Sequence, residues 1–326
     1  MSCDESPSDV LVRLTALSDK ARHYAAEMWF REAWPDVVEV AGERAQPLVH
    51  ELAAILFKPD GVACQVVKPA LEFLAARDFT PLAAQPVRLD RQITRWMWLY
   101  RFNVASVERV RLHDLIHAAG DSVLVMLRDD RAAGGPIPGT VRLTAAKGSS
   151  RPERRTGDQL RTYLRNENRI LNFLHTSDEP ADLVRELGIL LDRDERRRLL
   201  TSVLDGEPFV LPPVAAPFAG GPRELDLART LARLQAGAGA GADDPAARGS
   251  EDAAIERAAG AAAVGEAGAL RRLWSLLADR GDVDRWDRAV VGAHAIDYDD
   301  PGADKQTLGD APVELWARRA AAATTT

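Results

Sequence analysis

The chain has little cysteine, no excess of positive charge and no long apolar run, and each lack excludes a class of protein. Only Cys3 and Cys64 occur among 326 residues, which excludes a disulfide framework and a cysteine-based zinc site. The net charge of −7 argues against a general nucleic-acid or anionic-membrane surface, because such surfaces depend on summed positive charge. No window approaches about 18 uninterrupted apolar residues, so no membrane-spanning helix is expected.

The first ten residues, MSCDESPSDV, are acidic and polar, and they lack the apolar stretch of a secretory signal. We therefore expect a soluble cytoplasmic protein. Apolar residues make up 46% of the chain and seven tryptophans are present, so a packed core is expected. The length fits one sizeable domain with extensions, or two modest domains.

Four short apolar segments are predicted to be strands. They are ELAAILF (51–57), the proline-interrupted FTPLAAQPVRL (79–89), SVLVMLRDD (122–130) and RILNFLH (169–175). Helical patterns follow or separate them at 66–78, 91–118, roughly 140–147, 157–166 and 179–191. Strands separated by helices predict an α/β sandwich in which helices cover the sheet.

Segments on both sides of this region read as extensions. Residues 8–33 carry apolar positions at helical spacing, with Ser8 as the N-cap and Pro35 ending or turning the segment. We expect this arm to pack on a core or on another subunit. Beyond about residue 206 the chain is first proline-rich. A glycine- and alanine-rich stretch at 235–252 then reads as a flexible linker, before an alanine-rich helix that contains 270–281.

Several polar side chains stand where the predicted strands end. Lys58 ends the first strand and His175 ends the fourth, so neighbouring strands would bring them to one rim of the sheet. Asn172 would face away from His175 on a regular strand, and the two can cooperate only if the strand is kinked or ends between them. Glu186, on the next helix, can fix the tautomer of the imidazole and leave its other nitrogen as a nucleophile. Arg161 could hold a phosphate with two hydrogen bonds.

These segments resemble those of a known family. FKPDGV (57–62), NFLHTSD (172–178) and RELGILL (185–191) are similar to nucleoside diphosphate kinases. In that family a Lys-Pro-Asp-Gly turn follows the first strand, an Asn-x-x-His-Gly-Ser-Asp segment carries the phosphorylated histidine, and a glutamate follows eleven residues later. The resemblance covers roughly 49–200, about half the chain. It implies a ferredoxin-like βαββαβ sandwich with a four-stranded antiparallel sheet, and helical extensions at both ends.

The resemblance also implies three parts and a set of residue roles. The parts are an N-terminal helical extension at 1–48, the kinase-like domain at 49–205 and a partly helical C-terminal extension at 206–326. His175 is implied to become phosphohistidine, with Ser177 and Glu186 supporting it. The residues implied to bind the nucleotide are Lys58, Arg161 and Asn172 on phosphates and sugar, Tyr100 near the histidine, and Ser150 on a phosphate.

Some positions depart from the family pattern. Thr144 stands where the family has a phosphate-binding arginine, and Arg142 is the candidate replacement. On a helix, however, a shift of two residues turns the side chain by about 200°. Thr176 replaces the glycine after the histidine. The family offers an aromatic ring on one side of the nucleotide base and a small apolar residue on the opposite side. Here residues 106–112 contain no aromatic residue, and Arg169 stands where the small apolar residue is found.

The function that this pattern predicts is transfer of the γ-phosphoryl of a nucleoside triphosphate through a phosphohistidine to a nucleoside diphosphate or related acceptor. Mg²⁺ would arrive with the nucleotide phosphates, and relatives of this kind assemble into oligomers. One alternative is a specialised relative acting on an unusual nucleotide or phosphorylated metabolite, and another is a non-catalytic nucleotide-binding or assembly module. His113 and His117 have metal-ligand spacing but no third ligand in view. AGAGAGA (236–242) follows no strand and lacks the Gly-Lys-Ser/Thr ending of a phosphate loop.

Overall fold

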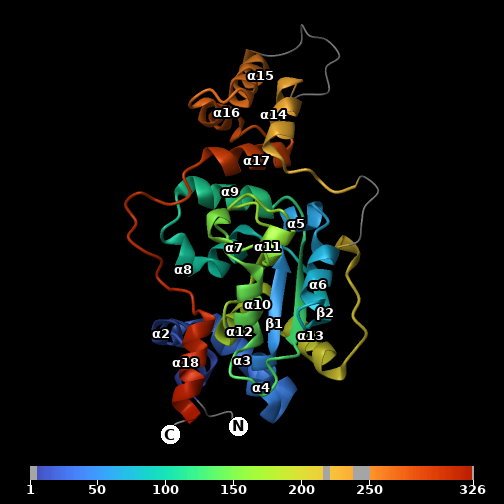
Figure 1. Ribbon diagram of the computed structural model, residues 1–326, viewed down its shortest axis with the longest axis vertical. Coiled ribbons are helices and arrows are strands. Elements are labelled where there is room, and N and C mark those ends of the chain that lie inside the picture. The colour runs from blue at the N-terminus through green and yellow to red at the C-terminus, as the bar shows by residue number, and fades with distance from the viewer. Residues whose placement is uncertain (1–5, 216–220, 238–249, 325–326) are drawn as a thin grey trace.

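A computed structural model describes residues 6–215, 221–237 and 250–324, and a four-stranded antiparallel sheet lies at its centre (Figure 1). The strand order is β2-β3-β1-β4, with bounds β1 (Leu52–Phe57), β2 (Phe79–Val87), β3 (Ser122–Asp129) and β4 (Leu174–Thr176). β1 lies between β3 and β4 and is antiparallel to both, and β2 forms the edge beside β3. This is the predicted ferredoxin-like βαββαβ arrangement, so the predicted fold class is confirmed.

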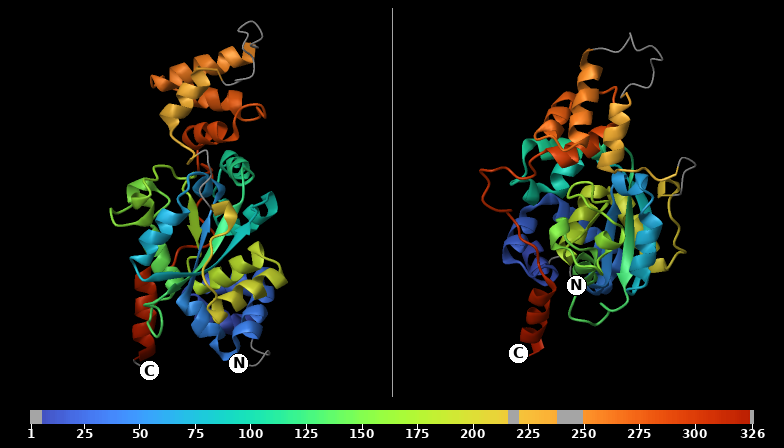
Figure 2. Two further views of the ribbon diagram at one scale, coloured as in Figure 1. Left: turned by 90° about the vertical axis from the view of Figure 1, so that its right-hand side faces the viewer. Right: turned by 45° about the horizontal axis from the view of Figure 1, so that its top comes forward.

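Alternate residues of β1 belong to two different cores, as the two-residue period of a strand requires. Ala53, Ile55 and Phe57 pack with the crossover helices α6 (Val67–Ala75) and α10 (Gly139–Lys147). Ala54 and Leu56 pack with α12 (Pro180–Leu190) and α13 (Arg193–Asp205) on the opposite face. Figure 2 shows the sheet between these two layers. Both faces are therefore covered by helices.

The other helices form three groups. The N-terminal group is α1 (Pro7–Leu14), α2 (Ser18–Ala26), α3 (Met28–Ala41) and α4 (Ala45–Glu51). Short helices after the strands are α5 (Pro59–Ala63), α7 (Arg91–Met97), α8 (Leu99–Phe102), α9 (Val107–His117) and α11 (Leu160–Tyr163). The C-terminal group is α14 (Leu227–Gln235), α15 (Ser250–Ala263), α16 (Ala269–Leu277), α17 (Arg285–Ala295) and α18 (Val313–Thr324). In none of the described parts is a helix both long and apolar enough to cross a lipid bilayer.

The N-terminal arm differs from the single helix expected at 8–33. It breaks after α1 because Thr15 Oγ1 and the amide of Ala16 both donate to the carboxylate of Glu179, each at 2.7 Å. The N-cap of α1 is Ser6 and not Ser8.

Pro35 lies inside α3 and does not end it. α3 buries one face against α12 and α13, and that packing outweighs the one helical hydrogen bond that a proline cannot donate.

Three further expectations on local structure were wrong. The helix expected at 91–118 is broken into α7, α8 and α9, with Ser106 capping the last of them. The helix expected at 157–166 is reduced to α11, where Arg165 adopts a φ of 53° and ends it. The strand expected at 169–175 begins only at Leu174. Asn168 Oδ1 accepts hydrogen bonds from the amides of Ile170 (2.7 Å) and Leu171 (3.0 Å), which diverts the backbone into a turn.

The C-terminal group caps the sheet domain at one end. α14 to α17 share a core with Leu112 and Ile116 of α9 and with Ile170 and Leu171, just before β4. From α17 the chain runs back along the domain as an extended segment, residues 296–312, here named the strap, and ends in α18 beside α10 and the N-terminal arm (Figure 1). Most of the linker expected at 235–252 lies outside the described residues.

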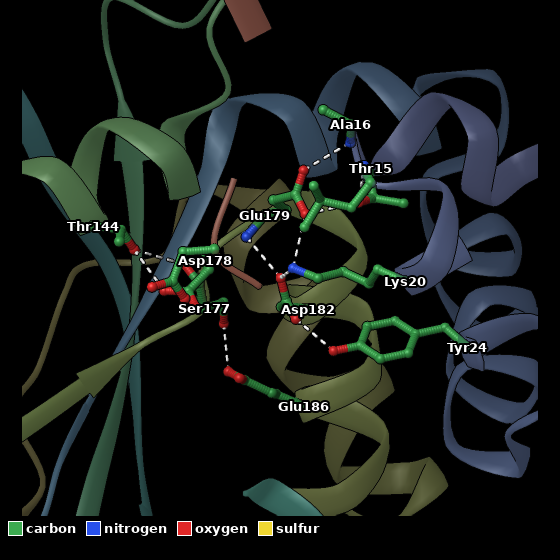
Figure 3. A network of polar contacts seen from close by, with 12 residues as sticks. Thr15, Ala16, Lys20, Tyr24, Thr144, Ser177, Asp178, Glu179, Asp182 and Glu186 are labelled. Carbon is green, nitrogen blue, oxygen red and sulfur yellow. Dashed lines mark hydrogen bonds and ion pairs between the residues drawn. The ribbon is translucent and has the colours of Figure 1, made fainter. Parts of the chain in front are cut away.

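A buried ion cluster joins the N-terminal arm to α12 (Figure 3), and α18 also contacts it. Lys20 Nζ lies 2.7 Å from Glu179 and 2.6 Å from Asp182, at the start of α12. Tyr24 donates a hydrogen bond to Asp182 (2.6 Å), and Trp316 of α18 donates one to Glu179 (3.0 Å). Glu179 is fully buried and Lys20 is nearly so. These contacts fix the position of α12 relative to both ends of the chain.

We predict that Lys20→Met lowers the free energy of unfolding by about 3–5 kcal/mol, because Glu179 and Asp182 are left buried without their cation. Urea unfolding followed by circular dichroism measures the effect. Lys68→Met is the matched control, since Lys68 is exposed and lies 4.0 Å from Glu72. It should change the same quantity by less than about 0.5 kcal/mol. Equal small effects of the two substitutions would contradict the role of this cluster.

Candidate active site

A cavity of about 790 Å³ opens beside the start of β4, and His175 lies in its wall. Nine lysine and arginine residues line the cavity against five aspartates and glutamates. Such an excess of cations in a concave, partly desolvated site favours anionic ligands. The cavity therefore has the electrostatic character of an anion-binding site.

His175 is held by a chain of hydrogen bonds that begins on its own strand. His175 pairs with Leu56 of β1, so its side chain lies on the face of the sheet that α12 covers. Its Nε2 lies 2.8 Å from Glu186 Oε1, and Ser177 donates a hydrogen bond of 2.6 Å to the other carboxylate oxygen. Burial raises the pKa of Glu186, but His175 and the hydroxyl of Ser177 together outweigh burial and leave that pKa below its usual value.

Because the carboxylate of Glu186 is ionised and can only accept, the Nε2 of His175 must carry the proton. The Nδ1 atom then carries the lone pair. No hydrogen bond to Nδ1 occurs among the described residues, and His175 faces the cavity. The arrangement therefore presents Nδ1 as a nucleophile while Glu186 orients the ring.

The turn after β1 fixes the backbone that leads into β4. Asp60 Oδ2 accepts a hydrogen bond from the amide of Phe173 (2.8 Å), and Lys58 donates one from Nζ to the carbonyl of Ile170 (2.8 Å). Gly61 touches the same backbone, since a Cβ placed there would lie 2.4 Å from the carbonyl oxygen of Phe173. Phe173 itself adopts a φ of 68°. The Lys-Pro-Asp-Gly turn thus holds a left-handed kink immediately before His175.

Arg161, Lys147 and Arg101 supply positive charge at the inner end of the cavity. The two terminal nitrogens of Arg161 donate to the carbonyls of Gly148 and Leu174, each at 2.8 Å, whereas its buried Nε has no hydrogen-bond partner. Burial and neighbouring cations lower the pKa of Arg161. No carboxylate within ion-pair distance neutralises this guanidinium among the described residues, so a bound anion is its natural counter-charge.

Lys147 stands beside the strand that carries the histidine. Its Nζ donates a hydrogen bond of 2.6 Å to Thr176 Oγ1 and lies 3.7 Å from Asp178. Arg101 holds Asp178 more closely, at 2.6 Å. Burial, the largest cause, lowers the pKa of Lys147. Together with the opposing effect of Asp178 and the charges of Arg161 and Arg101, it leaves that pKa at about 8. Lys147 therefore loses its charge within an accessible range of pH.

The structure brings most of the predicted site residues together. His175, Lys58, Asn172, Arg161 and Ser150 line the cavity, and Glu186 and Ser177 stand behind the imidazole. Asn172 and His175 lie on opposite sides of the kink at Phe173, so β4 begins between them. A kink between Asn172 and His175 is one of the two conditions under which the two side chains were expected to cooperate.

Tyr100 and Arg142 do not line the large cavity, although Tyr100 and His175 both line a smaller pocket of about 30 Å³. The hydroxyl of Tyr100 donates to Glu27 of the N-terminal arm, and its ring packs with Tyr24. Arg142 points the other way along α10, where its Nε lies 2.9 Å from Asp129. The proposal that Arg142 replaces the missing phosphate-binding arginine was therefore wrong, for the reason of helical direction that the spacing implied.

Lys147 and Arg101 are site residues that the sequence reasoning missed. Lys147 lies three residues after Thr144 on α10, and residues three apart share one face of a helix. The spacing of three residues from Thr144 could therefore have identified Lys147 from the sequence. Arg101 gave no signal of its own, because its place depends on α8, which had been read as part of a longer helix.

The histidine pair on α9 is buried among aromatic side chains. His117 shares a hydrogen bond of 2.8 Å with Thr94, and both imidazoles pack against Trp98. Burial lowers the pKa of His113 and His117 well below the usual value, so both rings are neutral. Within the described ranges no group of three or more His, Cys, Asp or Glu side chains could hold a metal ion.

We predict that the affinity for sulfate, whose charge is constant in this range, falls by up to about tenfold per pH unit above pH 8. Lys147 is charged below its pKa of about 8 and neutral above it, so the anion loses one counter-charge. Isothermal titration calorimetry of wild type and Lys147→Gln from pH 7 to about pH 9 measures the effect. Lys147→Gln should bind weakly throughout and show little pH dependence. An equal slope in both proteins would contradict the prediction.

Comparison with known proteins identifies similar solved structures. The chain is similar to a nucleoside diphosphate kinase family protein from Babesia bovis, at 14% identity and TM-score 0.36, over 44% of this chain and 90% of that one. It is also similar to a nucleoside diphosphate kinase from Encephalitozoon cuniculi, at 14% identity and TM-score 0.35, over 43% of this chain and 87% of that one. A third similar structure is the nucleoside diphosphate kinase from Aquifex aeolicus, at 18% identity and TM-score 0.35, over 44% of this chain and 97% of that one. No protein-family model and no curated protein matches the chain. Each of the three structures matches less than half of this chain.

Proposed function

We propose that the protein is a phosphotransferase that moves the γ-phosphoryl of a nucleoside triphosphate, through phosphohistidine at His175, to a nucleoside diphosphate or a related acceptor. The observation that carries the proposal is the Ser177–Glu186–His175 chain of hydrogen bonds in the wall of a cationic cavity. Such a chain leaves one imidazole nitrogen unprotonated and aimed at bound ligand. The similarity of the Lys-Pro-Asp-Gly and Asn-x-x-His segments to nucleoside diphosphate kinases supports the same assignment.

In the first half-reaction the lone pair of His175 Nδ1 attacks the γ-phosphorus. The bond from that phosphorus to the β,γ-bridging oxygen breaks, and the nucleoside diphosphate leaves with the electron pair. The proton on Nε2 stays in its hydrogen bond to Glu186 and stabilises the positive charge that develops on the ring. No proton has to be removed from the nucleophile, because the tautomer is already set.

In the second half-reaction a terminal phosphate oxygen of the acceptor attacks the phosphohistidine, and the phosphorus–nitrogen bond breaks. Lys58, Arg161 and Lys147 would neutralise phosphate charge in both directions, since phosphoryl transfer depends mainly on positioning and charge stabilisation. We expect the donor to be the Mg²⁺ complex of the nucleotide, with the ion held by phosphate oxygens. A homo-oligomer, as in proteins of this kind, is part of the proposal.

We predict that incubation with γ-labelled ATP and Mg²⁺ gives acid-labile, base-stable label on the protein, and that His175→Ala carries none. Glu186→Gln should slow labelling on the order of 10²-fold, because a glutamine does not compensate the imidazolium charge. Rapid quenching with scintillation counting gives the rates. Release of the label by added nucleoside diphosphate then tests the second half-reaction.

Glu72→Gln is the matched control, because Glu72 is an exposed glutamate on α6 and should not affect labelling. Equal label on wild type and His175→Ala would refute the phosphohistidine. A wild type that binds ATP but never becomes labelled would identify a non-catalytic nucleotide-binding module instead.

A further inference from the structure

The outer wall of the cavity contains three arginines that converge on one carboxylate. Arg109 of α9 and Arg169, before β4, lie 2.9 Å and 3.0 Å from the carboxylate of Asp299. Arg151, from the loop after α10, lies 3.5 Å from its second oxygen. Asp299 belongs to the strap, whereas the arginines come from three separate parts of the sheet domain. All four side chains line the same cavity as His175. We call Arg109, Arg151 and Arg169 the arginine triad.

The triad holds more charge than Asp299 can neutralise. Three guanidinium groups share one carboxylate, which leaves two positive charges. The Nε of Arg109 is buried and has no hydrogen-bond partner. Burial, followed by the charge of Arg169, lowers the pKa of Arg109 to about 10. A dianionic group in the cavity would supply the missing charge.

Asp299 is fixed by its backbone and does not behave as a removable plug. Its residue forms a β-bridge with Ala105. On either side, the amide of Asp300 donates to the carbonyl of Val104 (2.8 Å) and the amide of Ser106 donates to the carbonyl of Tyr298 (3.2 Å). The carboxylate therefore orders the arginines and leaves their remaining donors for a ligand.

The triad and the histidine belong to one ligand path. The carbonyl of Arg169 accepts a hydrogen bond from Asn172 Nδ2 (2.8 Å), which places the triad next to the kinked segment that carries His175. Apart from the histidines, Trp98 is the one aromatic residue in the wall of this cavity. Its ring stacks on His113 and turns an edge to His175. Recognition at the outer end therefore rests on charge rather than on stacking.

We propose that the arginine triad is a subsite for a second phosphate group of the acceptor, remote from the phosphate that receives the phosphoryl group. The acceptor class is then a bis-phosphorylated small molecule. This identification of the acceptor rests on the proposed function, while the anion subsite itself does not. The second phosphate takes no part in the bond changes at His175 and serves to position the acceptor.

The test is calorimetric binding of two probes to the unphosphorylated full chain. Glucose 1-phosphate and glucose 1,6-bisphosphate differ by one phosphate at the far end of the sugar. Wild type should bind the bisphosphate at least about tenfold more tightly, since two or more charge-assisted hydrogen bonds are added. Arg109→Gln with Arg169→Gln should abolish that preference. Asp299→Asn, which removes the competing negative charge, should strengthen bisphosphate binding several-fold.

The two variants break the same ion pairs, so a purely structural role would move both in the same direction. Weaker bisphosphate binding in both, or no preference in wild type, would overturn the proposal. Arg111→Gln is the matched control, because Arg111 lies on the same helix but is exposed and outside the cavity. Phosphohistidine labelling is measured separately. If the protein becomes labelled but does not prefer the bisphosphate, the subsite is refuted and the proposed transfer is not. If it prefers the bisphosphate but never becomes labelled, the proposed transfer is refuted and the subsite is not.

Discussion

The position of His175 depends on one close contact between two distant turns. The carbonyl of Phe173 lies so near Gly61 that no side chain fits between them, and Asp60 holds the amide of the same residue. Phe173 is thereby kept in a left-handed conformation that costs of order 1–3 kcal/mol for a bulky residue. The strand can begin only after this kink. The imidazole then falls opposite Leu56, on the face that α12 covers, where Glu186 can reach it.

The partner of the imidazole is fixed just as firmly from the other side. α12 is buried along its whole length, and its start is held by Lys20 from the N-terminal arm and Trp316 from the last helix. Arg185, the neighbour of Glu186, pairs with Glu27 of the same arm at 2.5 Å. The segments outside the sheet domain therefore belong to the support of the site. Preorganised side chains of this kind lose little entropy when a ligand binds.

Short-range motifs in the sequence predicted which residues lie together better than they predicted the local structure around them. Lys58 and His175 were identified at strand ends, and Glu186 by its place eleven residues after the histidine. The fold holds all three within one site. The length of β4 could not be read from RILNFLH, because its apolar residues 170 and 171 pack against the C-terminal helices instead of lying in the sheet. Lys147 was overlooked because Arg142, also close to Thr144, was taken as the replacement for the missing arginine. The strap was unpredictable, because its pairing with 104–106 spans almost two hundred residues.

The cations of the cavity connect its two ends energetically. Lys147 at the inner end and Arg109 at the outer end both have a lowered pKa, first through burial and then through like charges nearby. Holding these groups together without a full set of counter-ions opposes folding, and a bound polyanion removes that opposition. An uncharged base leaves this repulsion between the cations in place, whereas a ligand with phosphate at both ends would relieve it twice. The excess of cations in the wall therefore favours an acceptor that carries negative charge at both of its ends.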